Sequence, residues 1–379
     1  MKKSGLGCMK ISRSTAVSRG YCVREFDRSK ARGADMNEEQ KKYDIHFTGV
    51  AYDARYPVIW CGFTSFAGDL LWTFDPKTKK FASRGFTPLR EKEEVKIHRG
   101  LQVGPDGCLY FGTAALVNIP QRHEAPGGRL FRYDPSKDKY EFLGRPVPHD
   151  YIQTIDVDHK RGIIYGATYP LGHFFGWDME KKKLLFQAYI EDWPHQVRVD
   201  DGGQCWATYC VNPRSPKIRL LKYSPETAQL TWTDVALPGD SGQEDAGIDS
   251  FVNGGDGFLY IGTITGALMR LDPRETRAEF IIKPAPSKFF GALTPPVHGK
   301  IYGIAGGGAT TQVFSYDLKS GDVVLYGSAY DKERKTSIFR PHELVMGPNR
   351  CLYCPETDNP QRQCYFWEIK LSGTDARPV

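Results

Sequence analysis

Hydrophobic and polar residues alternate along most of the chain in short segments that end at turn-forming residues. One segment type recurs as small–x–apolar–aromatic–x–small, which is the pattern of a half-buried strand. Its aromatic residue falls at Trp60, Tyr110, Tyr165, Trp206, Tyr260, Tyr302 and Tyr353. The spacing runs from 41 residues between positions 165 and 206 to 55 between 110 and 165. This period predicts a repeat architecture.

A second segment follows each of these and ends in aromatic–acid–proline or a close variant. The copies are Phe74-Asp75-Pro76, Tyr133-Asp134-Pro135, Trp177-Asp178, Tyr223-Ser224-Pro225, Leu271-Asp272-Pro273, Tyr316-Asp317 and Trp367-Glu368. Glycine-rich turns such as Gly104-Pro105-Asp106-Gly107 separate the segments, as in antiparallel hairpins. Four short strands in each of seven repeats predict an all-β fold, a seven-bladed β-propeller with four antiparallel strands per blade.

The repeats occupy residues 41–373, which we expect to form the propeller. Residues 1–40 are polar, basic and aperiodic, and we expect a poorly ordered leader there, with a short tail at 374–379. The first 20 residues contain no apolar core of the kind found in signal peptides, so no export signal is expected. The chain also has no apolar run of the length needed to cross a bilayer, which excludes a membrane-spanning protein.

The composition limits the class of ligand and the state of the cysteines. Of the 379 residues, 40% are hydrophobic and 25% charged, and the net charge of +6 is spread along the chain, which favours an anionic ligand over nucleic acid. The nine cysteines are an odd number in a long chain, so we expect reduced thiols rather than a disulfide framework.

The alternating strand direction predicts which loops share one end of the ring. In each blade, the loop that leads into the first strand lies at the same end of the ring as the loop that joins the second and third strands. Ligands of propellers bind at this end. The longest second-to-third loop contains His123, and its length favours a function for the pair His98 and His123. The other candidates in these loops are Tyr169, His173, His195, Arg198, Tyr209, Arg340 and His342.

These residue types limit the chemistry. The sequence has no Gly-x-Ser-x-Gly, His-Glu-x-x-His or phosphate-binding glycine loop. Histidine, tyrosine and arginine together suit proton transfer beside a carboxylate, as in β-elimination of a uronate-containing polysaccharide. A zinc site was considered at His342, Cys351, Cys354 and Cys364. Cys351 and Cys354 lie three apart on one strand and should face opposite sides, which favours buried thiols.

Several runs resemble the seven-bladed propeller polysaccharide lyases, in particular the ulvan lyases of polysaccharide lyase families 24 and 25. The runs are His98 to Gly107, Gly127 to Pro135, Tyr165 to Pro170, His173 to Phe175 and Glu356 to Pro360, together with His123. The resemblance implies cleavage of a 4-linked uronate beside a sulfated rhamnose, with His98, His123 and Tyr169 as catalytic residues. It also implies an arginine on the substrate carboxylate. The corresponding stretch, Met179 to Lys183, has none, which leaves Arg198 or a lysine as the candidate.

The leading hypothesis is therefore a carbon–oxygen lyase acting on an anionic polysaccharide or oligosaccharide. It requires no cofactor, with a structural zinc or calcium ion left open, and we expect a monomer with no nucleic-acid or membrane partner. The resemblance implies a periplasmic or secreted location. Two alternatives are a non-catalytic propeller that binds carbohydrate or a protein partner on the same face, and a calcium-dependent propeller lactonase. The lactonase ranks last because the loops offer few acidic ligands.

Overall fold

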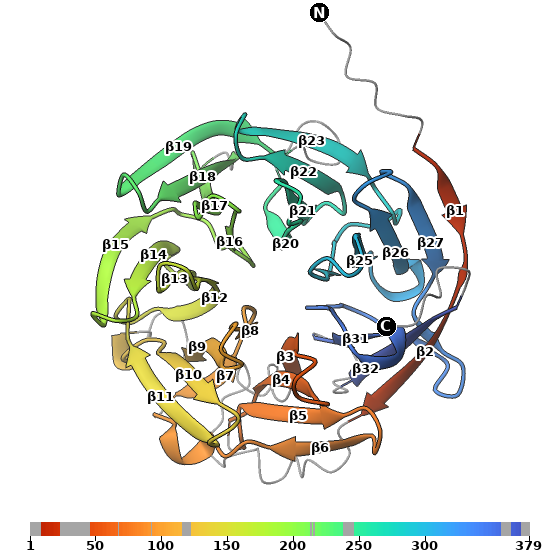
Figure 1. Ribbon diagram of the computed structural model, residues 1–379, viewed down its shortest axis with the longest axis horizontal. Coiled ribbons are helices and arrows are strands. Elements are labelled where there is room, and N and C mark those ends of the chain that lie inside the picture. Colours follow the sequence, from red (N-terminus) through yellow and green to blue (C-terminus); the bar gives the residue numbers. More distant parts are fainter. Residues whose placement is uncertain are drawn as a thin grey trace, which may run out of the picture.

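Antiparallel sheets follow one another around a ring in chain order (Figure 1). The computed structural model describes residues 9–22, 46–66, 68–91, 93–115, 123–212, 214, 217–237, 246–357 and 365–372. The described chain is built almost wholly of strands, with isolated 3-10 turns such as η1 (Thr87–Leu89). No helix in these ranges is long and apolar enough to span a membrane. The all-β expectation is confirmed.

Three of the four four-stranded sheets pair their strands in sequence order from the centre of the ring outward. They are β12 (Tyr151–Asp158), β13 (Ile163–Tyr169), β14 (His173–Asp178) and β15 (Lys183–Tyr189); β16 (Arg198–Val199), β17 (Cys205–Cys210), β18 (Ile218–Ser224) and β19 (Gln229–Ala236); and β20 (Ile248–Asn253), β21 (Leu259–Thr263), β22 (Leu268–Asp272) and β23 (Arg277–Ile282). The repeated aromatic segments form the second strand of each sheet, as predicted.

A nine-stranded sheet precedes them in the chain. It contains β3 (His46–Tyr52), β4 (Ile59–Thr64), β5 (Leu71–Asp75), β6 (Lys80–Ser83), β7 (Glu94–Ile97), β8 (Gln102–Val103), β9 (Leu109–Ala115), β10 (Leu130–Asp134) and β11 (Lys139–Gly144). Strand β7 pairs with both β4 and β9, and it thereby joins two groups of strands that otherwise repeat the order of the four-stranded sheets.

The last two large sheets include strands from the N-terminus. β24 (Ala292–Leu293), β25 (Lys300–Ala305), β26 (Gln312–Asp317) and β27 (Val323–Gly327) are joined by β1 (Ile11–Arg13), while β30 (Val345–Met346), β31 (Cys351–Pro355) and β32 (Tyr365–Ser372) are joined by β2 (Thr15–Cys22). β1 runs parallel to β27, and β2 runs antiparallel to β32 over its full length. A separate pair, β28 (Tyr330–Asp331) and β29 (Thr336–Ser337), lies outside these sheets.

The N-terminal strands correct the expectation of a poorly ordered leader for residues 11–22; residues 1–8 and 23–40 of that leader, and the tail at 374–379, lie outside the described residues. Residues 11–13 and 15–22 supply the outer strands of two sheets. Over Thr15 to Gly20, exposed positions alternate with covered ones, as expected for an outer strand with one face in water, so polar residues are tolerated there.

The repeated residues have architectural roles. The hydroxyl groups of Tyr110 and Tyr260 bond to Asp106 at 3.0 Å and Asp256 at 2.8 Å, each in the turn just before its strand. The aspartates of the second segment close the next hairpin, since Asp75 accepts the backbone N–H of Lys77 at 2.7 Å. The aromatic–acid repeats therefore stabilise turns and are not site residues.

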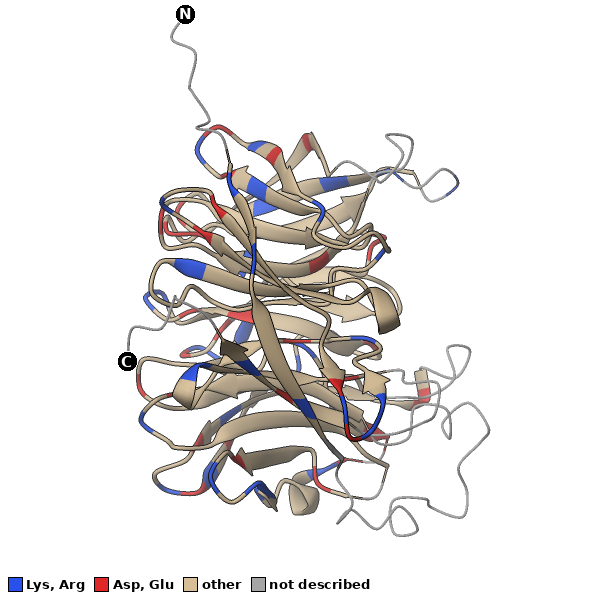
Figure 2. Ribbon diagram, turned by 90° about the vertical axis from the view of Figure 1, so that its right-hand side faces the viewer, with Lys and Arg blue, Asp and Glu red and all other residues tan. Residues whose placement is uncertain are grey.

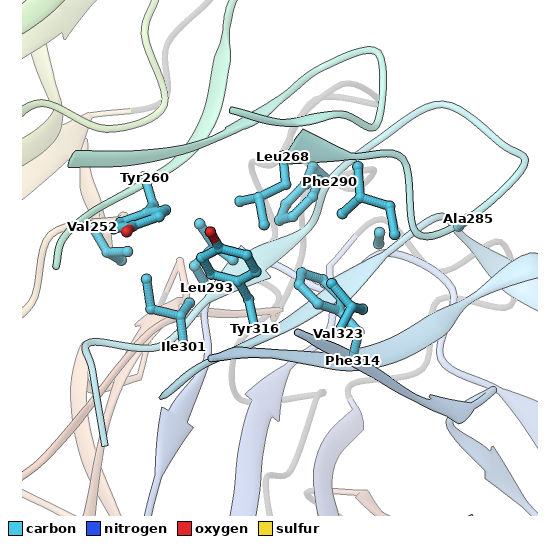
Figure 3. Packing of buried hydrophobic residues seen from close by; sticks show 12 residues of the cluster. Val252, Tyr260, Leu268, Ala285, Phe290, Leu293, Ile301, Phe314, Tyr316 and Val323 are labelled. Atoms are coloured by element: carbon cyan, nitrogen blue, oxygen red, sulfur yellow. The ribbon is translucent and has the colours of Figure 1, made fainter. Parts of the chain in front are cut away.

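The hydrophobic core lies between neighbouring sheets. Figure 3 shows one such layer, in which Val252, Tyr260 and Leu268 face Ile301, Phe314 and Tyr316 of the next sheet. Burial of these side chains between sheets supplies the main favourable free energy of folding. On the side that Figure 2 shows, charged residues of both signs are interspersed along the strands and turns.

Candidate functional site

Side chains from four sheets meet at one end of the central channel. We call His98, Arg99, His195, Asp249 and His342 the mouth cluster. The rings of His98 and His342 lie edge to face with centroids 4.8 Å apart. Arg99 donates from Nε to Nε2 of His342 at 3.2 Å, and its Nη2 lies 3.2 Å from Oδ1 of Asp249.

Three residues proposed from the sequence, His98, His195 and His342, are therefore brought together, while Arg99 and Asp249 were missed as site residues. The spacing of the sequence repeat could have identified both Arg99 and Asp249. Arg99, His195, Asp249 and His342 each stand 11 residues before the repeated aromatic of their own sheet. Equal distance from this landmark places residues at the same height in the channel.

The buried histidines are held in one tautomer. Nδ1 of His98 lies 2.7 Å from the carbonyl oxygen of Gln153, and Nδ1 of His342 lies 2.7 Å from that of Thr48. A carbonyl oxygen only accepts hydrogen bonds, so each Nδ1 carries the proton and each Nε2 presents a lone pair. In His342 this lone pair accepts the Arg99 bond.

Burial keeps these imidazoles neutral. It lowers the pKa of His98 well below 6.5, and the nearby charges of Lys96 and Arg99 lower it further. Burial likewise lowers the pKa of His342 well below its usual value, followed by the charge of Arg99. His98 and His342 are therefore uncharged at neutral pH, and their lowered pKa values make them weak bases.

His195 forms the cluster's most open acid–base pair. Its Nδ1 lies 2.7 Å from Oδ1 of Asp249, and its side chain is 24% exposed against 4% for the aspartate. Burial and the charge of Arg99 lower the pKa of His195, although Asp249 opposes them. Burial raises the pKa of Asp249, but the charge of Arg99 and the bond from His195 outweigh it and leave a net decrease. Asp249 thus stays ionised and directs Nε2 of His195 away from itself.

Glu343 forms a second layer directly beneath the cluster. Its carboxylate accepts the backbone N–H groups of Gly100 at 2.9 Å and Val50 at 2.8 Å, and the side-chain amide of Gln196 at 3.4 Å. Burial raises its pKa. Because the donors come from three other parts of the ring, this layer ties the inner strands together across the channel.

A cavity of about 220 Å³ lies beneath this layer, bordered by Glu343, Gln102 and Tyr52. Arg198 also lines this cavity and does not join the mouth cluster. Its Nη1 is 2.9 Å from Oδ1 of Asp156, and its Nε donates to the carbonyl of Phe251 at 2.8 Å. The arginine selected for a substrate carboxylate is thus engaged in the lower channel.

Tyr169 lies at the same end of the ring as the cluster, at the end of β13. Its ring packs against Tyr151 at 5.0 Å and edge to face against Trp193 at 5.5 Å. His123 is exposed in the loop before β10, and among the described residues no hydrogen bond or ring contact joins it to His98. The expected pair of His98 and His123 is therefore not formed by direct contact.

Two other candidates are tied to their own sheets. Nδ1 of His173 lies 2.9 Å from Asp150, which also accepts the hydroxyl of Thr168 at 2.8 Å. The same acid–threonine contact recurs between Glu94 and Thr113, so it is part of the repeat architecture. The hydroxyl of Tyr209 donates to the carbonyl of Thr233 on the outer strand at 3.0 Å and points away from the channel.

Arg340 lies at the edge of the mouth. Its guanidinium sits 5.3 Å above the ring of Phe289, and it is half-buried. Its charge is close enough to lower the pKa of Asp249 and of His195. Arg340 is thus the predicted arginine that contributes positive charge at this end of the channel.

The cysteine positions agree with the spacing argument. Cys351 packs in the core beside Phe74 and Tyr353, whereas Cys354 packs in a different core layer beside Trp367. In the ranges that the structure describes, no group of three or more His, Cys, Asp or Glu is arranged to hold a metal ion. Cys364 lies outside those ranges.

Comparison with solved structures identifies the architecture. U3-55K matches with a TM-score of 0.57 at 8% identity, over 90% of this chain and 97% of that one. The WD40 repeats of RRP9 match with a TM-score of 0.56 at 8% identity, over 90% and 96%. The chain has a β-propeller fold.

A third similarity is to the extracellular domain described as that of the hybrid two component system BT4673 from B. thetaiotaomicron. The match has a TM-score of 0.58 at 16% identity, and it covers 97% of this chain but only 44% of the other chain. This chain thus spans less than half of that domain. No family model and no curated protein matches the chain. At these sequence identities the similarities establish the fold alone, and the activity has to be argued from the residues of the site.

Proposed function

We propose that the mouth of this propeller binds an acidic polysaccharide and cleaves it at a uronate by β-elimination. The observation that carries the proposal is the pair of His195 and Asp249, which presents a partly open imidazole beside two neutral, buried histidines and two arginines. Such a set can accept a proton next to a carboxylate at neutral pH. We also propose seven blades, with the nine-stranded sheet counted as two that β7 joins.

The reaction needs three operations. Positive charge neutralises the uronate carboxylate and thereby acidifies the proton on the adjacent carbon C5. A base removes that proton, and its electron pair forms the C4–C5 double bond as the C4–O bond breaks. The departing oxygen takes a proton from an acid, which leaves an unsaturated uronate and a shortened chain.

The side chains can be assigned to these operations. Arg340 supports the carboxylate, because its charge reaches the mouth, where it lowers the pKa of Asp249 and of His195. Tyr169 and His195 carry the proton steps. His98 keeps its lone pair on Nε2 beside them, and His123 reaches the substrate from its exposed loop. We further propose a secreted or periplasmic location, in agreement with a polymer substrate.

The direct test is incubation with a panel of uronate polysaccharides, including ulvan, alginate and polygalacturonate, while ultraviolet absorbance of the unsaturated product is recorded. We expect absorbance to rise with at least one polymer and not with a neutral glucan. The proposal fails if no polymer produces the signal at any pH between 5 and 9.

A second candidate function is binding of the same class of polymer without cleavage. It is favoured by one observation: Arg99 and Glu343 are fully engaged in bonds across the channel, which is expected of structural residues. Retention on the polymer without any unsaturated product would support this function.

A further inference from the structure

We propose that Trp193, together with Tyr169 and Tyr151, forms an aromatic shelf that binds a pyranose ring of the acidic glycan beside the mouth cluster. The inference deepens the proposed function, since it rests on a glycan ligand and names the residues that would hold a neighbouring sugar unit. Trp193 was not among the candidates from the sequence.

The indole of Trp193 is about half exposed. Its side chain lies in the connection between β15 and β16, two residues before His195, and is 53% exposed. Exposure of a tryptophan keeps a large apolar surface in water, which is costly unless a partner covers it. Its place next to the open histidine puts this surface at the mouth.

The shelf is also held in a fixed orientation. Nε1 of Trp193 donates to the carbonyl oxygen of Pro170 at 2.8 Å, and its ring stands edge to face with Tyr169 at 5.5 Å. Tyr169 in turn packs on Tyr151 with centroids 5.0 Å apart. A ring positioned before the ligand arrives loses little conformational freedom on binding.

The chemistry of the surroundings selects a sugar. One face of a pyranose carries axial C–H groups that pack on an aromatic ring, while its hydroxyl groups remain in water or bond to polar neighbours. Arg340 adds positive charge at the same end of the channel, which suits a glycan that also carries carboxylates or sulfates. The shelf supplies the apolar contact and the mouth supplies the ionic one.

The chain offers a matched control in Trp232. This indole is 47% exposed and also stands edge to face with a tyrosine, Tyr209, at 4.8 Å. It lies on β19, the outer strand of its sheet, away from the channel (Figure 1). Trp193 and Trp232 therefore differ in position but hardly in exposure or local packing.

Affinity electrophoresis in gels that contain ulvan, alginate or polygalacturonate tests the proposal on the full chain. Trp193→Ala should weaken retardation by the bound polymer on the order of tenfold or more, as expected for loss of a central tryptophan contact. Trp193→Phe should restore most of it, because it keeps an aromatic face, and Trp232→Ala should match wild type. Far-ultraviolet circular dichroism and melting temperatures identify any variant that fails to fold.

The outcomes separate the shelf from the lyase activity. If the polymer retards the wild type but not Trp193→Ala, and no unsaturated product forms, the shelf is supported and the lyase activity is overturned. Cleavage that persists with unchanged retardation in Trp193→Ala overturns the shelf and leaves the lyase standing. Equal losses in Trp193→Ala and Trp232→Ala, or no retardation of wild type in any gel, also overturn the shelf.

Discussion

At the scale of single residues, the mouth depends on keeping its histidines neutral. His98 and His342 each use Nδ1 on a backbone carbonyl, and both have pKa values lowered by burial and nearby positive charge. Protonation would place a positive charge beside Arg99 in a buried site. The cost of doing so couples the protonation of these rings to the stability of the fold.

The lowered pKa values predict loss of stability at mildly acidic pH. Below about pH 6.5 the unfolded chain binds protons on these histidines while the folded chain does not, so the free energy of unfolding falls as pH decreases. Urea denaturation at pH 7.5 and at pH 5.5 measures this change in the free energy of unfolding. His342→Gln should reduce this pH dependence, because it removes one of the two buried rings. Equal slopes in wild type and His342→Gln would contradict the prediction.

A second residue-scale prediction separates chemistry from packing in two tyrosines. Tyr169→Phe keeps the ring but removes the proton-carrying oxygen, and should lower turnover of a cleaved polymer by about 10²-fold or more. Tyr165→Phe is the control, because its buried hydroxyl has no hydrogen-bond partner among the described residues, so turnover should stay within a few-fold and stability should not fall. Full activity in Tyr169→Phe would exclude it as a proton carrier.

At the scale of elements, closure of the ring depends on β2. This strand pairs with β32 although the two are separated by most of the sequence. The backbone N–H of Gly20 points to Asp331 at 2.9 Å and not to β32. Since N–H direction alternates along an antiparallel strand, the N–H of Val17 faces β32.

This geometry predicts that Val17→Pro destabilises the protein. The proline removes a ladder hydrogen bond without loss of core packing, since the Val17 side chain is exposed, and we expect a cost of about 1–3 kcal/mol. Val17→Thr keeps the β-branched shape and the N–H and serves as control. Thermal unfolding compares them, and an unchanged melting temperature for Val17→Pro would mean that β2 does not help to close the ring.

At the scale of the whole molecule, polar bonds across the channel fasten the inner strands. Glu343 is the central example, because it accepts two backbone N–H groups from different parts of the ring. Glu343→Ala leaves both donors buried and unpaired, with an expected loss of about 2–5 kcal/mol.

Glu343→Gln keeps one acceptor oxygen and should lose less, so the order of stability in chemical denaturation should be wild type, Gln, then Ala. A Glu343→Ala protein as stable as wild type would show that the layer does not hold the strands together. The same series tests whether the layer acts on the mouth, since polymer retention should weaken only in proportion to unfolding.

Local pattern was sufficient for much of this molecule. Strand alternation, turn residues and the two repeated segments predicted an all-β propeller with its aromatic strands second in each sheet, because these features depend on neighbours in sequence. The same reasoning placed His98, His195 and His342 at one end, since strand direction alone determines the end at which a loop lies. Cys351 and Cys354 also face opposite core layers, as their spacing requires.

Only the tertiary structure decided which residues meet. Arg99 reaches His342 and Asp249 because the ring brings together inner strands that are distant in sequence, and the polar N-terminal segment becomes a strand because β32 presents an open edge to it. Arg198 was placed at the mouth from its position on the first strand of its sheet, yet its guanidinium pairs with Asp156 in the lower channel. Contacts between sequence-distant side chains depend on closure of the whole ring, and no local pattern encodes them.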